Sequence, residues 1–153
     1  VDPFGTKFLD GLATGGSLAD AQFSDDVYFE LAPSPTNNPI KQKIDLILLG
    51  EYDGPLNSFE FYLEANMSGG PEGDVIQTIE LWNETDSIWE LVDTRAATNV
   101  DTVVAVTATG DLSRFVHPQT SEVLSRIVWA SPSFSGASFD WTVDVDQFGW
   151  LIS

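Results

Sequence analysis

The sequence predicts an all-β protein, an antiparallel β-sandwich of about nine strands and of the jelly-roll type. Helical signals are nearly absent, because no long run places apolar residues three and four positions apart between capping residues. The chain instead consists of short β-branched and aromatic runs that clusters of Gly, Pro, Asn and Asp separate. An immunoglobulin-like sandwich is the second choice, and the absence of a Cys–Trp–Cys pattern speaks against it.

The predicted strands are β-branched and aromatic runs between turn residues, and in several of them apolar and polar residues alternate with a period of two. The clearest case is 58–65, where Phe59, Phe61 and Leu63 face one way and the polar residues between them the other. The runs 75–83 and 88–95 flank a polar turn and predict a hairpin. The segment 109–121 predicts a long loop or a short helical turn. The nine predicted strands are 4–11, 27–32, 40–49, 58–65, 75–83, 88–95, 101–108, 122–130 and 139–153.

Length, charge and composition limit the kinds of partner that the protein can bind. The 153 residues are expected to form one domain, 1–153, and, because they begin with Val1 and not Met, to be a processed product or one module of a longer protein. The net charge of −18 disfavours nucleic acid and anionic membrane surfaces and suits cations or neutral glycans. No run of 18 apolar residues predicts a membrane span. Without cysteine the chain has no disulfides and no thiolate metal ligands.

Catalysis is the least favoured function class. The single histidine, His117, stands before a proline in a polar loop, and no nucleophile, phosphate-loop or metalloprotease motif accompanies it. A glycosidase needs only two carboxylates at the correct separation, so the 24 acidic residues leave that alternative open. We therefore expect a protein that is not an enzyme.

Aromatic residues and one arginine predict a ligand site. Among five tryptophans, Trp141 shares the parity of core valines, whereas Trp82 and Trp89 flank the polar turn of the predicted hairpin. An exposed indole face stacks on the apolar face of a pyranose ring, which makes these two residues the candidates for sugar contact. Arg126 lies in a strand among apolar residues and must pair with a carboxylate; ligand recognition is its alternative role.

Aspartates near the two ends of the chain predict a calcium site. Calcium prefers carboxylate and carbonyl oxygens, which Asp25 and Asp26 supply from a loop before a strand. Asp146 follows in the last strand, and first and last strands often lie together in sandwiches. The alternative is that all three carboxylates are simply solvated.

Four segments carry a resemblance that covers most of the chain: "GGSLADAQFSDDVYFEL", "IELWNETDSIWELVDTRAA", "GDLSRFVHPQTSEVLSRIVW" and "FDWTVDVDQFGW". Together they resemble a module of large secreted or surface proteins of environmental bacteria, planctomycetes in particular. The resemblance implies a secreted bacterial protein with further attached domains. The last segment is also similar to the closing strand of carbohydrate-binding-module-like jelly rolls. That similarity implies a structural calcium ligand at Asp146, or less readily at Asp144.

These observations predict a non-catalytic, carbohydrate-binding accessory module of a secreted protein, outside the cell or on its surface. Polysaccharide or glycan is the expected partner, with Trp82, Trp89 and Arg126 as ligand-binding residues. Calcium is the expected cofactor, held by Asp25, Asp26 and Asp146. The alternative is a structural or protein-interaction module with no small-molecule ligand.

Overall fold

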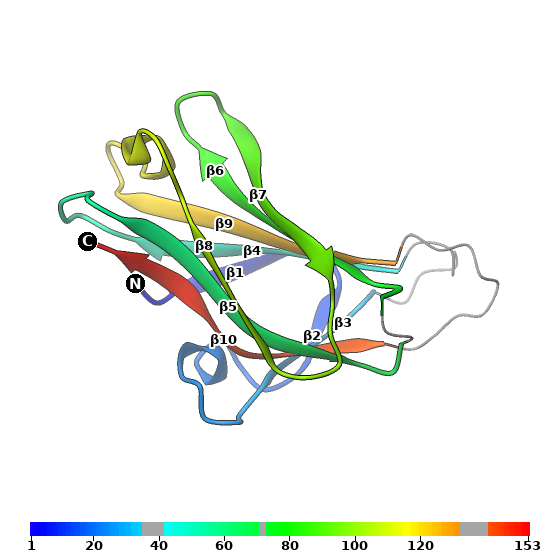
Figure 1. Cartoon of the computed structure of the whole chain (residues 1–153). Coiled ribbons are helices and arrows are strands. Elements are labelled where there is room, and N and C mark those ends of the chain that lie inside the picture. The colour runs from blue at the N-terminus through cyan, green and yellow to red at the C-terminus, as the bar shows by residue number, and fades with distance from the viewer. Residues whose placement is uncertain (35–41, 71–72, 132–140) are drawn as a thin grey trace.

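Ten strands in the described residues form two five-stranded sheets that pack face to face, with every pairing antiparallel (Figure 1). The structure is a computed structural model and describes residues 1–34, 42–70, 73–131 and 141–153. In spatial order, sheet A contains β1 (Gly5–Asp10), β4 (Lys43–Glu51), β9 (Glu122–Ala130), β6 (Ile76–Asn83) and β7 (Ile88–Ala96). Sheet B contains β2 (Leu12–Gly15), β3 (Phe29–Ala32), β10 (Thr142–Ile152), β5 (Phe59–Ser68) and β8 (Thr102–Thr107). Two 3-10 turns, η1 (Asp20–Gln22) and η2 (Leu112–Phe115), lie in the connections.

The strand order is that of a jelly roll. From β3 to β10 the chain crosses between the sheets at every connection except the β6–β7 hairpin. The resulting orders, β3-β10-β5-β8 and β4-β9-β6-β7, are the two interleaved four-stranded sheets of that fold. β1 and β2 add one edge strand to each sheet. The predicted all-β jelly-roll sandwich is confirmed, with ten strands in place of about nine.

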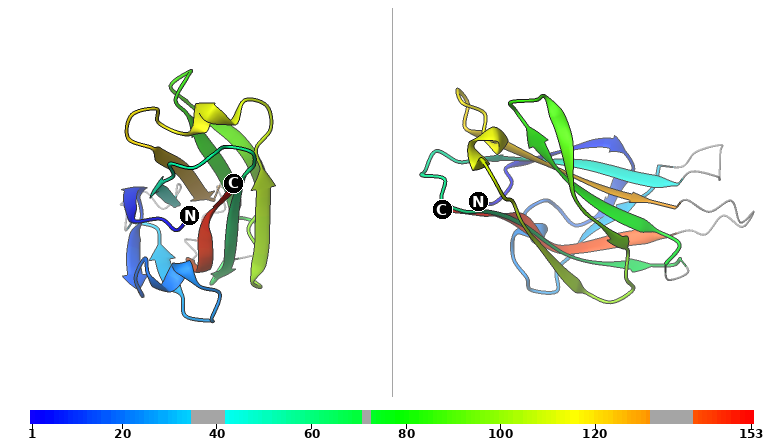
Figure 2. Two further views of the ribbon diagram at one scale, coloured as in Figure 1. Left: turned by 90° about the vertical axis from the view of Figure 1, so that its left-hand side faces the viewer. Right: turned by 45° about the horizontal axis from the view of Figure 1, so that its top comes forward.

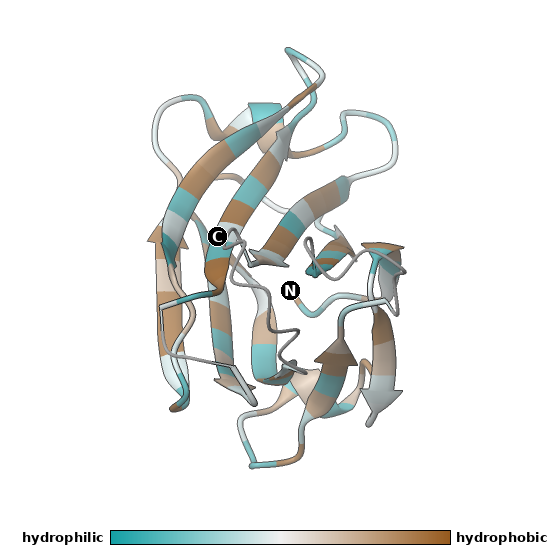
Figure 3. Cartoon of the chain, turned by 90° about the vertical axis from the view of Figure 1, so that its right-hand side faces the viewer, coloured by the Kyte–Doolittle hydropathy of each residue, from teal (hydrophilic) through white to brown (hydrophobic). Residues whose placement is uncertain are grey.

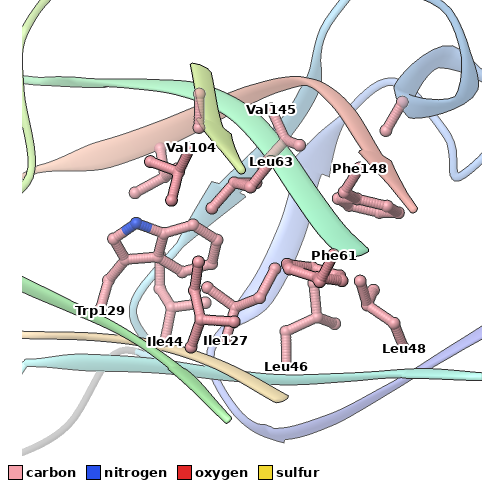
Figure 4. Close-up of a cluster of buried hydrophobic side chains, with 14 of the residues drawn as sticks. Ile44, Leu46, Leu48, Phe61, Leu63, Val104, Ile127, Trp129, Val145 and Phe148 are labelled. Carbon is pink, nitrogen blue, oxygen red and sulfur yellow. The ribbon is translucent and has the colours of Figure 1, made fainter. Parts of the chain in front are cut away.

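The core lies between the sheets because the strands alternate as predicted. β5 and β9 bury every second residue along their length, and the same banding of apolar and polar residues runs along neighbouring strands in Figure 3. Burial of these apolar side chains away from water is the main force that holds the two layers together. Figure 4 shows the facing side chains of the two sheets, Ile44, Leu46, Leu48, Ile127 and Trp129 against Phe61, Leu63, Val104, Val145 and Phe148.

Three of the five tryptophans belong to this core. Trp129, Trp141 and Trp150 are all buried. The indole N–H of Trp129 donates to Gln77 Oε1 at 2.9 Å, and that of Trp150 donates to Ser125 Oγ at 2.7 Å. These two polar side chains on the inner face of sheet A satisfy donors that would be costly to bury unpaired.

The start of the chain differs from the prediction. The single strand expected at 4–11 ends at Gly11, whose φ of 86° takes the chain out of β1 and across to β2 in the other sheet. The Gly11 amide is held there by Asp10 Oδ1 at 2.8 Å and Ser34 Oγ at 2.9 Å. Residues 40, 41, 139 and 140 of the predicted strands lie outside the described residues. None of the described helical turns has the length and apolar character needed to cross a membrane.

Candidate functional site

Two tryptophans lie side by side on the outer face of sheet A. Trp82 near the end of β6 is directly opposite Trp89 near the start of β7. Their ring centroids are 5.2 Å apart and the rings are inclined by 63°, an edge-to-face contact. Both side chains are partly exposed. Among the described residues, neither indole N–H has a hydrogen-bond acceptor, so both donors remain unpaired.

Arg126 lies on the same face, one strand away. Its Nε and Nη2 donate to the two carboxylate oxygens of Asp45 at 2.7 and 2.6 Å, and its Nη1 donates to Glu80 Oε2 at 3.1 Å. The predicted carboxylate partner of Arg126 is thus confirmed, as a two-pronged fork. The guanidinium carbon is 6.0 Å from the centre of the Trp89 ring. The structure therefore brings the three predicted ligand-binding residues together.

The fork is anchored by a buried charge. Asp45 has only 2% of its side chain exposed and also pairs with Lys43 Nζ at 2.5 Å. Burial disfavours the charged carboxylate, but the hydrogen bonds from Arg126 and Lys43 outweigh burial and hold the pKa of Asp45 below its usual range. An anchored guanidinium keeps a fixed direction, and fixed polar groups orient a ligand better than mobile ones.

Basic residues are confined to the sheet A side of the described structure. Lys7, Lys43 and Arg126 lie on sheet A strands at its outer face, Arg95 lies on β7, and Arg114 binds Glu90 of β7. The described strands of sheet B contain no lysine or arginine. Consequently Asp45 and Glu80, beside the tryptophan pair, are paired with basic side chains, whereas the carboxylates on the described strands of sheet B are not.

The predicted calcium residues meet through backbone amides. Asp146 is buried in β10, and its Oδ1 accepts hydrogen bonds from the amides of Asp25 at 3.3 Å and Asp26 at 3.1 Å. Asp26 has a positive φ of 62°, and the Asp25 carboxylate turns back to the Val27 amide at 3.1 Å. The two ends of the chain are thus joined as the sequence suggested. The contacts are hydrogen bonds from two backbone amides to one carboxylate oxygen.

No group of three or more acidic or histidine side chains in the described residues converges closely enough to hold a metal ion. The acidic surface nearest to Asp146 is the outer face of sheet B. There, burial and the neighbouring charges of Glu30 and Asp101 raise the pKa of Asp144. The hydrogen bond that Tyr28 donates to Asp101 raises the pKa of the phenol to about 12. Calcium binding by Asp25, Asp26 and Asp146 stays a prediction.

Sequence reasoning missed Asp45 and Glu80 as members of the site. Asp45 reads as one of several polar residues on the solvent side of 40–49, and Glu80 as an ordinary polar position in a hairpin strand. Their partner Arg126 is 81 and 46 residues away along the chain, and spacing carries no information about such pairs. The one available signal was that Arg126 lies in a strand among apolar residues, which indicates that it pairs with a carboxylate but not which one.

Comparison with known proteins shows relatives of the fold only. The sequence matches no protein-family model and none of the curated proteins. Among solved structures, a carbohydrate-binding module of family 29 matches with a TM-score of 0.50 and 10% identity, over 95% of this chain and 77% of that one. An exo-beta-agarase matches with a TM-score of 0.60 and 11% identity, over 99% of this chain and 24% of that one. The chain therefore shares its jelly-roll sandwich with a carbohydrate-binding module and with about a quarter of an agarase.

Proposed function

We propose that this protein is a non-catalytic carbohydrate-binding module that binds glycan on the outer face of sheet A. The observation that carries the proposal is the placement of Trp82, Trp89 and Arg126 within one small area of that face. The tryptophan rings offer apolar surface to the C–H face of a sugar ring, and Arg126 with Glu80 offers hydrogen bonds to its hydroxyls. The likeness to a carbohydrate-binding module supports the fold on which this site is built.

The geometry favours a single soluble glycan chain. Rings inclined by 63° do not form one plane, so they cannot lie flat together on a crystalline polysaccharide surface. One indole can stack on a sugar while the other closes its side. The net charge of −18 further favours a neutral glycan over an anionic one, because like charges repel at long range.

A glycan array, run with calcium and with chelator, followed by titration of the best soluble glycan, tests the proposal. The variants are Trp82→Ala, Trp89→Ala and, as the matched control, Phe23→Ala, which removes an aromatic side chain that is 63% exposed in a loop. Loss of one stacked indole is expected to weaken binding about 10- to 100-fold, since burying an aromatic ring contributes roughly 1.5–3 kcal/mol. The control should bind like the unaltered protein.

Two outcomes would contradict the proposal. One is a Trp82→Ala, Trp89→Ala double variant that binds as tightly as the unaltered protein. The other is an array with no signal for any glycan, which would favour the alternative of a structural or protein-interaction module.

We also propose a structural calcium ion held by Asp25, Asp26 and Asp146. The support is that the loop of Asp25 and Asp26 lies against Asp146 through its backbone amides, together with the preference of calcium for carboxylate oxygens. The three carboxylates do not converge in the described structure, so the proposal requires the loop side chains to turn toward Asp146 when the ion binds. A ligand that binds only the folded state at 100 times its dissociation constant adds about 2.7 kcal/mol of stability, which is about 5–11 °C in a domain of this size. Thermal melts in calcium and in chelator measure this shift directly. An unchanged midpoint would exclude the ion.

The proposal extends to an extracellular or cell-surface module with further attached domains. Its support is indirect: polysaccharides are extracellular polymers, and a sandwich of this shape forms about a quarter of the agarase chain. Mass spectrometry of culture supernatant, membrane and cytosol from the source cells tests the location. Recovery of the protein only from the cytosol would contradict it.

A further inference from the structure

The β6–β7 turn, η2 and the loop that follows η2 lie at one end of the sandwich (Figure 2, left). Side chains from these connections line a half-open pocket of about 540 Å³, within the range of about 300–1,000 Å³ that small-molecule sites occupy. Its lining residues come from three connections: Leu56, Glu84, Thr85, Ser113, Val116, His117 and Pro118. None of them belongs to the tryptophan site on the outer face of sheet A.

The walls of this pocket are fixed by hydrogen bonds. The amide of Glu84 donates to the carbonyl of Arg114 at 2.7 Å, which ties the β6–β7 turn to η2. The Arg114 side chain binds both oxygens of Glu90 at 3.0 Å. Buried Asn83 shapes the turn, because its side-chain oxygen accepts from the Asp86 amide at 3.0 Å. A pocket held in this way needs little ordering when a ligand enters it.

The histidine of the pocket is also fixed, with one nitrogen free. His117 Nδ1 accepts hydrogen bonds from the amides of Gln119 at 3.3 Å and Thr120 at 3.1 Å. A neutral imidazole that accepts at Nδ1 carries its proton on Nε2. His117 therefore brings an N–H donor to the pocket, held by the turn that follows it.

Three polar groups of the pocket have no hydrogen-bond partner in the described part of the protein: the Glu84 carboxylate, the Thr85 hydroxyl and His117 Nε2. The fourth polar lining side chain, Ser113, donates to Asp111 Oδ1 at 2.7 Å. An acceptor, a donor and a hydroxyl that does both are therefore left for a ligand, in a pocket that Leu56, Val116 and Pro118 line with apolar surface.

We propose that this pocket is a second sugar site, which binds a single neutral pyranose ring such as the end of a glycan chain. A pyranose has one C–H-rich face, which suits the apolar wall, and a rim of hydroxyls, which suits the carboxylate, the hydroxyl and the imidazole N–H. Anionic ligands are disfavoured by Glu84 and by the net charge. The inference goes beyond the site on sheet A and does not depend on it.

The test is a titration followed by two-dimensional amide NMR, with D-glucose, D-galactose and D-mannose as separate probes and D-glucuronate as the charged counterpart of glucose. Concentrations reach roughly 100 mM, since ligands of one ring bind with millimolar dissociation constants. At least one neutral sugar is expected to give saturable shifts at the amides of Glu84, Thr85 and Ser113. The indole signals of Trp82 and Trp89 report separately on sheet A.

Three conservative variants locate the site. His117→Asn keeps an acceptor for the two loop amides but removes the Nε2 donor, Glu84→Gln removes the charge, and Thr85→Val removes the hydroxyl. Each is expected to weaken sugar binding several-fold to about tenfold, as loss of one hydrogen bond does. Phe23→Ala, the control at an exposed loop residue outside both sites, should leave the pocket shifts and their midpoint unchanged.

Absence of saturable pocket shifts with all three neutral sugars would overturn the inference, as would shifts confined to the two indoles. Equal affinity for glucuronate would overturn the assignment to neutral sugars. The two proposals can fail separately. If a neutral sugar shifts the pocket amides but the array shows no binding that depends on Trp82 or Trp89, the second site is supported and only the proposed site on sheet A is refuted.

Discussion

The buried ion pair beneath the tryptophan site permits a sharp stability prediction. Asp45→Asn keeps the shape of the side chain but removes the charge to which Arg126 is forked at 2.6 and 2.7 Å. Arg126 then retains Glu80 as its only carboxylate partner among the described residues, at 3.1 Å. Removing one member of a fully buried pair costs about 3–5 kcal/mol. Because 21% of the Arg126 side chain is exposed, water offsets part of this, and we expect about 2–3 kcal/mol.

The chain contains a matched control. Arg95 forks onto Asp93 with two hydrogen bonds of 2.7 Å, which is nearly the same geometry. Its side chains are 41% and 17% exposed, against 21% and 2% for Arg126 and Asp45. Asp93→Asn should therefore cost less than about 1 kcal/mol, as exposed pairs do. The forks themselves are alike, but the buried pair also joins two strands and has Lys43 and Glu80 as further partners, whereas Arg95 and Asp93 lie on one strand.

Thermal melts at neutral pH measure the difference. At about 2–4 °C per kcal/mol for a domain of this size, Asp45→Asn should lower the midpoint by about 4–12 °C and Asp93→Asn by less than about 4 °C. Equal losses in the two variants would refute the reasoning, because burial would then not decide the contribution of the fork.

The same pair predicts a pH dependence. The pKa of Asp45 is lower in the folded protein than in the unfolded chain, so its stabilising contribution is complete above the unfolded-state pKa of about 4. That contribution is lost as the pH falls through the lower folded-state value. The gap between the melting midpoints of the unaltered protein and of Asp45→Asn should therefore be constant near neutral pH and shrink below about pH 4. A gap that stays constant down to pH 2 would contradict this assignment.

Three further predictions follow from other contacts. Gly50→Ala should lower stability by about 1–3 kcal/mol in thermal melts, because its Cβ would lie 2.5 Å from Cζ3 of buried Trp150; an unchanged midpoint would mean that the indole moves freely. Asp146→Ala should cost about 1–3 kcal/mol even in chelator, since two loop amides lose their acceptor, and a loss seen only with calcium would assign that carboxylate to the ion alone. Glycan affinity should change less than about twofold between 0.05 and 0.5 M salt, because a neutral ligand releases no counterions; a tenfold change measured by calorimetry would indicate a charged ligand.

The sandwich was predictable because its evidence is local. Along β5, Phe59, Phe61 and Leu63 alternate with polar residues within one short stretch of sequence. The hairpin of β6 and β7 is indicated by a polar turn between two apolar runs. The break of the first strand into β1 and β2 was not predictable in this way. Gly11 serves equally well at the end of a strand and at a crossover between two sheets, and only the partners of its amide decide between them.

Sequence patterns identified Trp82, Trp89 and Arg126 as candidates, but not Asp45 or Glu80, and not the pairing that joins them to Arg126. The polar turn between Trp82 and Trp89 indicates strand ends, where aromatic residues are more exposed than in mid-strand. Arg126 was recognisable because a charge among apolar neighbours needs a partner. That this partner is Asp45, on a strand far back in the chain, depends on the order β4-β9-β6, which no local pattern contains.

The basic residues are unevenly distributed between the two sheets, and this affects which ligand the candidate site can bind. A protein with 24 acidic and 6 basic residues is expected to repel most surfaces and polymers that carry negative charge. Placing the described basic side chains at sheet A creates one face on which carboxylates are paired, such as Asp45 and Glu80 with Arg126. On that face a neutral ligand contacts hydrogen-bonding groups that ion pairs hold in place. Its binding does not require the dehydration of isolated charges, which costs more free energy than the dehydration of neutral polar groups. The uncompensated acids of sheet B, among them Glu30 and Asp144, lack this property. The same sandwich therefore presents one face on which carboxylates are paired with basic side chains, where the proposed glycan site lies, and another on which they are not.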